Sequence, residues 1–386
     1  MSKNFDFPTQ LDIIITCASG VEKVVKSELA RLGYPSNPAI NGAITFQGDL
    51  SAVARCNISL RSADRVFIKV AQFPALTFDQ LFDGVNAIDW RIFLPSDAKV
   101  NVNGKCVKSK IFAISACQSI VKKAIVEKLS SSYKINHLQE DGSLYEVEFS
   151  IFKDVCTIML NTSGGGLHKR GYRDMVGIAP IKETLASALL LMSDFYWDRP
   201  FLDPFCGSGT LVIEGAKIAL NIAPNLDRKF LFNNWKNFDS KIYSSAVEEA
   251  LDKQHLDRKI DFSGSDIDPK AIKLASRHAQ RAGLEGRVKF SVCDVKNLKI
   301  DKPFGTIVTN PPYGERVYDI QEALECYKNL GNALKDKTGW SAFVITSCNT
   351  FERHFGRRCD RERKLYNSNK ECRLYYYYGK KEKLND

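Results

Sequence analysis

The chain has 386 residues, of which 44% are hydrophobic and 26% charged, a composition typical of a globular protein with two or three domains. The formal net charge of +10 suggests a polyanionic partner. Eleven scattered cysteines without a C-x-x-C pair and five distant histidines argue against a disulfide framework or a metal site. With no apolar leader and no run of transmembrane length, we expect a soluble, cytoplasmic protein without a membrane partner.

The first 75 residues alternate between strand-like and helix-like patterns. The segments, in the order strand, helix, strand, helix, strand, are 11–16, 21–32, 44–49, 49–60 and 65–73. This order predicts a ferredoxin-like α+β unit over residues 1–75, which by itself indicates no function.

Residues 76–162 form a second predicted unit that is rich in lysine. Helices are expected over 78–90 and 119–131, and paired strands over 144–152 and 154–162. Between positions 99 and 134 eight lysines face one acid, so this segment is a candidate track for phosphates. The candidate contacts are Lys108, Lys110, Lys122, Lys123 and Lys128. A plain solvated face would explain the same charges.

A linker is predicted over residues 163–178. It begins with the run SGGGLHKRGYR, in which three consecutive glycines form a flexible joint. The glycines are followed by basic residues and an aromatic ring, a combination that can bind a phosphate and stack on a base. The candidate contacts are His168, Lys169, Arg170, Tyr172 and Arg173. A solvated linker is the alternative. A second basic segment, 353–373, holds eight basic residues against three acids.

Residues 179–386 alternate strands with helices, which predicts a doubly wound, mostly parallel α/β sheet. A polar residue closes each of four predicted strands: Asp203, Asp266, Asp294 and Asn310. Ligands of such sheets bind beyond the carboxyl ends of the strands, so these residues predict a nucleoside-type site. Asp203 and Asp266 are 63 residues apart, where a minimal βαβ unit needs about 30, and we therefore expect an insertion at 221–259.

The glycine turn after Asp203, Cys206-Gly207-Ser208-Gly209-Thr210, differs from both familiar phosphate cradles. It lacks the Lys-Ser/Thr of a P-loop, and Val212 takes the place of the last glycine in G-x-G-x-x-G. A carboxylate before the turn would repel a pyrophosphate and attract a cation. The turn thus favours S-adenosyl-L-methionine as the cofactor.

The run Asn310-Pro311-Pro312-Tyr313 follows an apolar strand that the two prolines must end. The Asn310 amide oxygen and the Pro311 carbonyl are suited to accept the hydrogens of an exocyclic amine, while Tyr313 stacks on the base. A strand-terminating turn without function is the alternative for this tetrapeptide taken alone.

Several runs resemble known families. FDQLF, IDW and IVKKAIV resemble the THUMP domain, an RNA-binding module, and DPFCGSGT and NPPY resemble class I methyltransferases that alkylate amino groups. Together GLHKRGYR, DPFCGSGTLVIE, SDIDPKAI and TNPPYGER resemble the THUMP-containing 23S ribosomal RNA guanine-N2 methyltransferases, often labelled adenine-specific DNA methylases. The resemblance implies a Rossmann-like methyltransferase domain over 179–386, preceded by a THUMP-like RNA-binding domain over 76–162. The implied partner is 23S rRNA or its precursor, with no metal and no oligomer required.

The same resemblance implies residue roles. Asp203 holds the donor's amino group, Asp266 the ribose hydroxyls, and Asp294 with the Val295 N–H the adenine. Thr184 closes the methionine end. The implied cofactor set also includes Pro204, Cys206, Gly207, Ser208, Gly209, Thr210 and Ile267, and the implied catalytic set is Asn310, Pro311, Pro312 and Tyr313.

Two other functions are compatible with the residues. A DNA adenine-N6 methyltransferase shares NPPY but needs no amino-terminal RNA module. A non-catalytic RNA-binding assembly factor would keep the fold alone. Guanine N2 is preferred over adenine N6 only by the family resemblance, because both amines fit the pocket.

Overall fold

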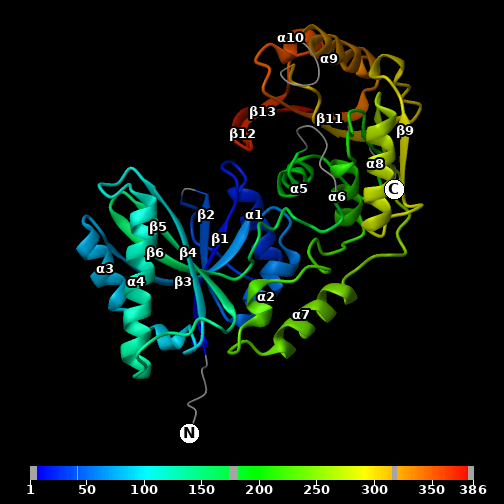
Figure 1. The fold of residues 1–386 in the computed structure, drawn as a ribbon. Coiled ribbons are helices and arrows are strands. Elements are labelled where there is room, and N and C mark those ends of the chain that lie inside the picture. Colours follow the sequence, from blue (N-terminus) through cyan, green and yellow to red (C-terminus); the bar gives the residue numbers. More distant parts are fainter. Residues whose placement is uncertain (1–6, 41, 174–180, 315–319, 381–386) are drawn as a thin grey trace. The chain divides into compact units, whose positions relative to one another are not determined.

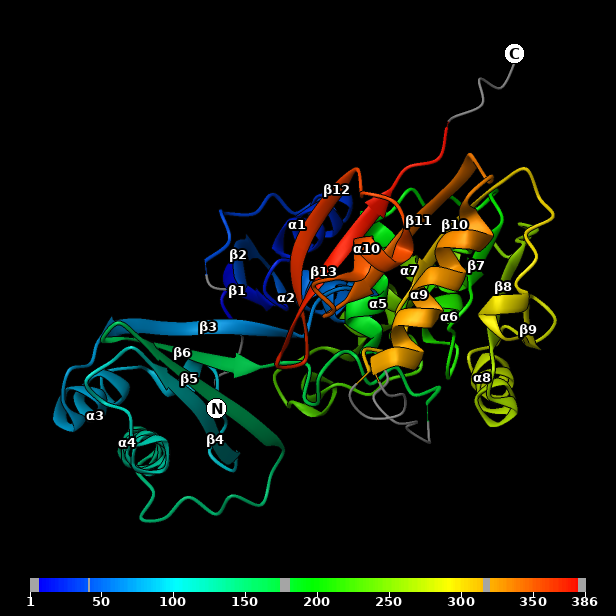
Figure 2. The same cartoon turned by 90° about the horizontal axis from the view of Figure 1, so that it is seen from above.

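The computed structural model describes residues 7–40, 42–173, 181–314 and 320–380. The chain forms two compact α/β units, which are treated separately below (Figures 1 and 2). Unit 1 comprises Met1–Thr16, Glu28–Leu167 and Arg228–Glu249, and unit 2 comprises Cys17–Ser27, His168–Asp227 and Ala250–Asp386.

Unit 1 is built on a six-stranded sheet of order β2-β1-β3-β6-β5-β4. Neighbouring strands are antiparallel, except that β4 and β5 run parallel. The strands are β1 (Leu11–Thr16), β2 (Ala43–Gly48), β3 (Arg65–Pro74), β4 (Lys99–Val107), β5 (Leu144–Phe152) and β6 (Val155–Asn161). The expected elements of the ferredoxin-like unit are all present, whereas β4 was not expected.

Helices accompany this sheet. They are α2 (Leu50–Ser59), α3 (Phe78–Asn86) and α4 (Ile114–Tyr133), with a 3-10 turn at Trp90–Ile92, while α1 (Glu22–Arg31) is divided between the two units. Helices α3 and α4 pack together, and α4 covers β4 (Figure 1). Helix α4 buries one stripe against the sheet, formed by Cys117, Val121, Ala124, Ile125 and Leu129. The helix expected over 119–131 is therefore present and extends further at both ends.

Most of the expected insertion packs within unit 1. The Trp235 ring stacks on Tyr145 of β5 with centroids 4.9 Å apart, and the Trp235 indole N–H donates to the Leu144 carbonyl at 3.1 Å. Helix α7 (Ser240–Asp252) follows, and its Glu249 forms an ion pair of 2.7 Å with Arg55 of α2. Residues Arg228–Glu249 therefore help to build the core beside β5.

Unit 2 is built on a seven-stranded sheet of order β12-β13-β11-β10-β7-β8-β9. Strands β9, β8, β7, β10 and β11 are parallel, and β12 and β13 form an antiparallel hairpin at one edge. The strands are β7 (Phe201–Asp203), β8 (Phe262–Asp266), β9 (Val288–Val292), β10 (Phe304–Thr309), β11 (Gly339–Thr346), β12 (Arg361–Asn367) and β13 (Lys370–Tyr377). Strand order reverses at β7, the point where ligands of such sheets bind.

Helices cover both faces of this sheet. Helices α5 (Glu183–Met192), α6 (Thr210–Ala219) and α8 (Pro269–Arg281) lie on one face, and α9 (Ile320–Leu334) and α10 (Phe351–Phe355) on the other (Figures 1 and 2). Tyr327 of α9 and Phe351 of α10 are buried against Ile307, Val344 and Tyr375 of the sheet. The doubly wound fold expected from the sequence is confirmed. Within the described part of the chain, no helix is both long and apolar enough to span a bilayer.

We expect Trp235→Ala to destabilise unit 1 by about 3–5 kcal/mol, because it removes a buried aromatic side chain and the Leu144 hydrogen bond. Hydrogen exchange should show the loss in the amides of β5. The control is Trp197→Ala in unit 2. The Trp197 side chain is 40% exposed, so its removal should lower the free energy of unfolding much less. Equal protection of β5 in the parent and the Trp235 variant would contradict a structural role for this segment.

Candidate active site

Four polar residues meet at the carboxyl edge of the parallel strands. Asp203 and Asp266 are the last residues of β7 and β8, Asn310 directly follows β10, and Asp294 follows β9 by two residues. Because these strands are parallel neighbours in the order β10-β7-β8-β9, their ends lie along the same edge of the sheet. The arrangement of strand ends that the sequence predicted is therefore present.

Asp203 is the most buried of the four, with 1% of its surface exposed. Its Oδ1 accepts hydrogen bonds from the Thr309 hydroxyl at 2.6 Å and from the Phe205 N–H at 3.2 Å. Burial raises the Asp203 pKa to about 7, although both hydrogen bonds act to lower it. A cation beside this carboxylate would favour its charged form, so Asp203 is suited to hold an ammonium group.

The glycine turn is held by β8. The Cys206 N–H donates to the Ser265 carbonyl at 2.9 Å, and the Gly207 N–H donates to Asp266 Oδ2 at 3.0 Å. At Gly209, where φ is +83°, a Cβ would come within 2.9 Å of the Phe290 ring. At Gly207 a Cβ would meet no protein atom within 4 Å among the described residues. The turn is thus packed tightly at Gly209 and open at Gly207, where a ligand can approach the backbone.

The carboxylates of Asp266 and Asp294 are less buried than that of Asp203. Asp266 Oδ1 accepts from the Asp268 N–H at 3.0 Å, while Asp294 Oδ1 accepts from the Lys296 N–H at 3.0 Å and caps the following 3-10 turn. The apolar side chain of Ile267 beside Asp266 is 50% exposed. The two carboxylates, with the exposed aliphatic side chain next to Asp266, are suited to the polar edges and apolar faces of a nucleoside.

The other cofactor residues expected from the sequence lie around this turn. Ser208 is partly exposed, and its carbonyl lies 3.1 Å from His278 Nδ1 on α8. The remaining five are buried: Thr184 in the first turn of α5, Pro204, Cys206, Thr210 at the start of α6, and Val295. No Lys or Arg side chain belongs to this set, so the donor set fits a cation better than a pyrophosphate.

The NPPY segment adopts a closed arrangement. The Tyr313 hydroxyl donates to Asn310 Oδ1 at 2.6 Å, and burial raises the Tyr313 pKa, so the hydroxyl remains protonated. The Tyr327 hydroxyl of α9 donates to the Pro312 carbonyl at 2.7 Å. An incoming amine would therefore have to replace the Tyr313 hydroxyl as the hydrogen-bond donor to Asn310 Oδ1.

The β12–β13 hairpin surrounds Tyr313. Asn367 Nδ2 donates to the Tyr313 hydroxyl at 3.4 Å, and the Lys370 ammonium lies 5.1 Å from the centre of the Tyr313 ring. The Cys372 thiol is 3.7 Å from the same hydroxyl. A base that stacks on Tyr313 would share this ring with the hairpin.

The GLHKRGYR segment is largely inside unit 2. The Tyr172 hydroxyl donates to Glu214 Oε1 of α6 at 3.0 Å, and Arg170, also buried, lies 3.8 Å from the same carboxylate. Arg173 forms a 3.0 Å ion pair with Glu183 at the start of α5. The segment packs against α5 and α6 through these contacts. Because Arg170 and Tyr172 are buried there, they have almost no surface for contact with RNA.

Two neighbouring residues of that segment keep accessible surface. Lys169 is exposed and His168 is partly exposed, and both lie within unit 2 together with Arg170. The predicted boundary between the linker and the methyltransferase region, at residues 178 and 179, lies outside the described residues.

The five lysines predicted to contact RNA lie in two settings within unit 1. On α4, Lys122 forms an ion pair of 2.9 Å with Glu140, and Lys123 one of 3.7 Å with Glu127. The hydrogen bond from Arg91 is the main cause that lowers the pKa of Asp89, and the charge of Lys128 lowers it further. By contrast, the other two lysines are exposed in the connection between β4 and α4: Lys108 and Lys110.

Sequence reasoning missed several supporting residues. Thr309 binds Asp203, Tyr327 fixes Pro312, and Glu214 anchors the GLHKRGYR segment. The detectable indication was Glu214, which with Lys217 is one of the two charged residues in the mainly apolar run LVIEGAKIAL. Among the residues that the structure describes, no cluster of three or more His, Cys, Asp or Glu side chains could hold a metal ion.

Three family models match the chain. The "RMKL-like, methyltransferase domain" matches residues 170–376, the "RlmL ferredoxin-like domain" residues 12–67 and the THUMP domain residues 75–161. The first match covers more than half of the chain. The protein therefore belongs to the RMKL-like methyltransferase family and carries a THUMP domain.

Relatives support this assignment. The chain is 43% identical to the "Putative RNA methyltransferase YpsC" of Bacillus subtilis, over 95% of this chain and 96% of that protein. It is 33% identical to the "Ribosomal RNA large subunit methyltransferase K/L" of Syntrophotalea carbinolica, over 93% of this chain and 52% of that protein. The chain thus spans about half the length of the K/L enzyme.

Solved structures share the fold over nearly the whole chain. "SMU.472, a putative methyltransferase complexed with SAH" gives a TM-score of 0.93 at 39% identity, covering 98% of this chain and 100% of that one. A "predicted N6-adenine-specific DNA methylase" from Listeria monocytogenes gives 0.92 at 43% identity, covering 96% and 97%.

We expect Asp203→Asn to stabilise the ligand-free protein at pH 8. The folded-state pKa of Asp203 is about 7, above the ordinary value of 3.8, so the folded state binds the extra proton between these values. Stability from this group is therefore complete below about pH 4 and is lost as the pH rises through 7. The variant's advantage in urea unfolding should shrink from pH 8 to pH 5. A difference independent of pH would contradict the raised pKa.

Proposed function

We propose that this protein is an S-adenosyl-L-methionine-dependent RNA methyltransferase that methylates an exocyclic amine of a base, namely guanine N2 in 23S ribosomal RNA. The observation that carries the proposal is the meeting of Asn310 with Asp203 and Asp266 at adjacent strand ends, at the point where the strand order reverses. The family membership supports methyl transfer, and the THUMP domain supports an RNA substrate.

The cofactor is assigned to the carboxyl edge of β7, β8 and β9. The buried Asp203 would hold the donor's ammonium group, Asp266 the ribose hydroxyls, and Asp294 with the Val295 N–H the adenine edge. Thr184, in the first turn of α5, would close the methionine end. The bound SAH in a structure 39% identical to this chain supports the assignment. When bound, the cofactor supplies an electrophilic methyl group on sulfur.

The base is assigned to NPPY. Asn310 Oδ1 and the Pro311 carbonyl would accept the two hydrogens of an aryl amine and orient its lone pair toward the methyl group. Positioning of this kind can contribute roughly 7–11 kcal/mol in favourable cases. The amine's proton can leave after transfer, so no dedicated base is required. An amine in a duplex cannot reach this pocket, so the target base must be unpaired or flipped.

An RNA substrate is favoured over DNA by unit 1. A DNA adenine-N6 methyltransferase needs no THUMP domain, although one close structural relative has been named as such an enzyme. The name of the K/L relative supports ribosomal RNA of the large subunit. Guanine N2 rests on the resemblance of GLHKRGYR and TNPPYGER to guanine-N2 methyltransferases.

We expect Asn310→Ala to reduce kcat by at least about 100-fold while the Kd for S-adenosyl-L-methionine stays within a few-fold, because Asn310 would contact the base and not the cofactor. Asp266→Ala should do the reverse and weaken cofactor binding measured by calorimetry. Asn332→Ala and Asp336→Ala, two exposed residues of unit 2, serve as matched controls. Loss of cofactor binding in the Asn310 variant would move this residue into the cofactor site.

The methylated product separates the candidate functions. Purified protein with labelled cofactor should methylate ribosomal RNA stripped of protein, and nucleoside mass spectrometry should identify N2-methylguanosine. N6-methyladenosine formed on duplex DNA would establish the rival enzyme. Cofactor binding without transfer to any nucleic acid would favour the non-catalytic assembly factor.

A further inference from the structure

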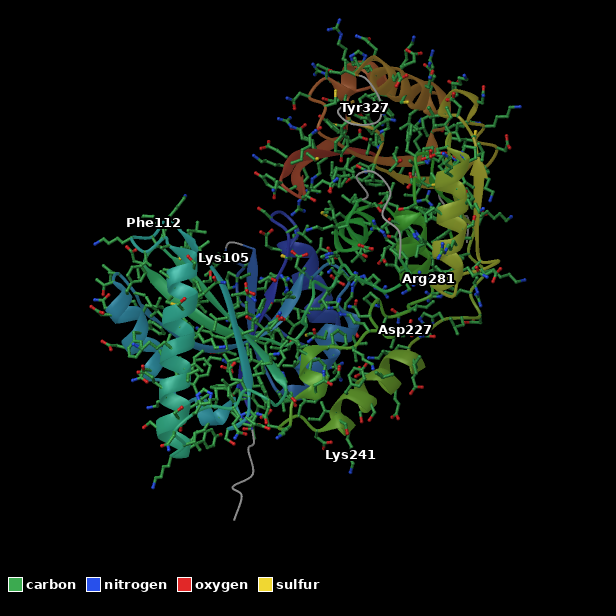
Figure 3. All side chains as sticks on the ribbon, in the orientation of Figure 1. Lys105, Phe112, Asp227, Lys241, Arg281 and Tyr327 are labelled. Carbon is green, nitrogen blue, oxygen red and sulfur yellow. The ribbon has the colours of Figure 1, made fainter. Side chains whose placement is uncertain are left out.

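Phe112 is 79% exposed, the largest exposed fraction among the large hydrophobic side chains of the described residues. It lies in the connection between β4 and α4, and Figure 3 labels it together with Lys105 of β4. The preceding residue, Ile111, is 5% exposed and supplies the apolar anchor of this connection. Phe112 is therefore not needed for packing.

The connection that carries Phe112 is fixed to the β5–β6 turn. The Lys110 N–H donates to Asp154 Oδ1 at 2.7 Å, and the Asp154 N–H donates to the Ser109 hydroxyl at 3.2 Å. The Ser109 hydroxyl in turn donates to the Val107 carbonyl at 3.0 Å. Because the backbone is already ordered, a ligand that binds Phe112 loses little free energy in ordering it.

Lysines are concentrated in the connection that carries Phe112 and in the segments next to it. Between Asp97 and Glu127 the chain holds six lysines and no acid. Four exposed lysines belong to β4, the connection and the β5–β6 turn: Lys105, Lys108, Lys110 and Lys153. The acid of that turn, Asp154, accepts the Lys110 backbone N–H. This end of the sheet therefore presents positive charge beside an exposed aromatic ring, whereas the α4 lysines lie beside Glu140, Glu127 and Asp89.

We propose that Phe112, with Lys105, Lys108, Lys110 and Lys153, forms a platform that binds an unpaired nucleotide of the substrate RNA. A base stacks on the Phe112 ring, and the lysines bind the adjoining phosphates. A single strand is the occupant, because bases in a duplex already stack on their neighbours and do not offer a face to a side chain. The proposal rests on the proposed function only in taking RNA as the substrate.

The stacking contact is tested by binding of a fluorescein-labelled, unstructured 12-nucleotide RNA to the full chain. Phe112→Ala should raise the Kd by roughly 5- to 100-fold, with an unchanged dependence on salt. Phe112→Trp should retain binding, and its added fluorescence should be quenched by the RNA. Ile40→Ala, at another exposed apolar residue of unit 1, is the matched control and should bind as the parent does.

The phosphate contacts are tested by salt titration of the same RNA. The double variant Lys108→Gln, Lys110→Gln should lower the slope of log Kd against log salt by about 1.4, at about 0.7 per lost contact on a single strand. A Phe112→Ala variant that binds the RNA with the parent's Kd would contradict the proposed platform. So would a Phe112→Ala variant that loses affinity for single-stranded and duplex RNA equally.

This measurement is independent of methyl transfer. A parent protein that binds the RNA through Phe112 but transfers no methyl group would refute the proposed function and leave the platform standing. If the parent methylates RNA and Phe112→Ala binds RNA as tightly as the parent does, the platform alone is refuted.

Discussion

The hydroxyl of Thr309 donates to the carboxylate of Asp203, and this hydrogen bond joins β10 to β7 at the point where the strand order of unit 2 reverses. A carboxylate removed from water is costly unless polar groups contact it, and here the Thr309 hydroxyl and the Phe205 N–H provide those contacts. Strand β10 leads directly into Asn310, and β7 leads into the glycine turn. The same bond therefore fixes the proposed base pocket beside the proposed cofactor site.

A second set of buried polar contacts supports this edge from one face of the sheet. Glu214 of α6 accepts hydrogen bonds from Tyr172 and from Ser187 of α5, the latter at 2.7 Å. Arg170 lies beside the same carboxylate and donates to Asn225 at 3.0 Å. These contacts hold α5 against α6, the helix that begins at the glycine turn. Because removal of one partner leaves the others buried without compensation, the set acts as a unit.

Sequence reasoning located the inner parallel strands of unit 2, β8, β7, β10 and β11, because they consist mainly of buried residues and end in polar ones. It missed β4 and β12, and both are edge strands. In β4 the early buried residues are Val100 and Val102, while lysine and asparagine occupy exposed positions; β12 exposes arginine and glutamate around the buried Leu365. In these two edge strands charged residues conceal the few apolar ones, whereas the edge strands β2 and β9 were found from the sequence. Burial of Tyr172 was equally hidden, because its partner follows 42 residues later.

The proposed base pocket depends on elements outside the repeating βα pattern. Tyr313 is contacted by Asn367, Lys370 and Cys372 of the antiparallel hairpin, a segment whose charges alone suggested only a basic surface. The Tyr327 hydroxyl fixes the Pro312 carbonyl from α9. The carboxylates of the cofactor edge, by contrast, stand on the parallel strands. Changes in the hairpin can therefore alter the surroundings of Tyr313 while leaving Asp203 and its contact with Thr309 in place. Under the proposed function, this separates the choice of base from the binding of the methyl donor.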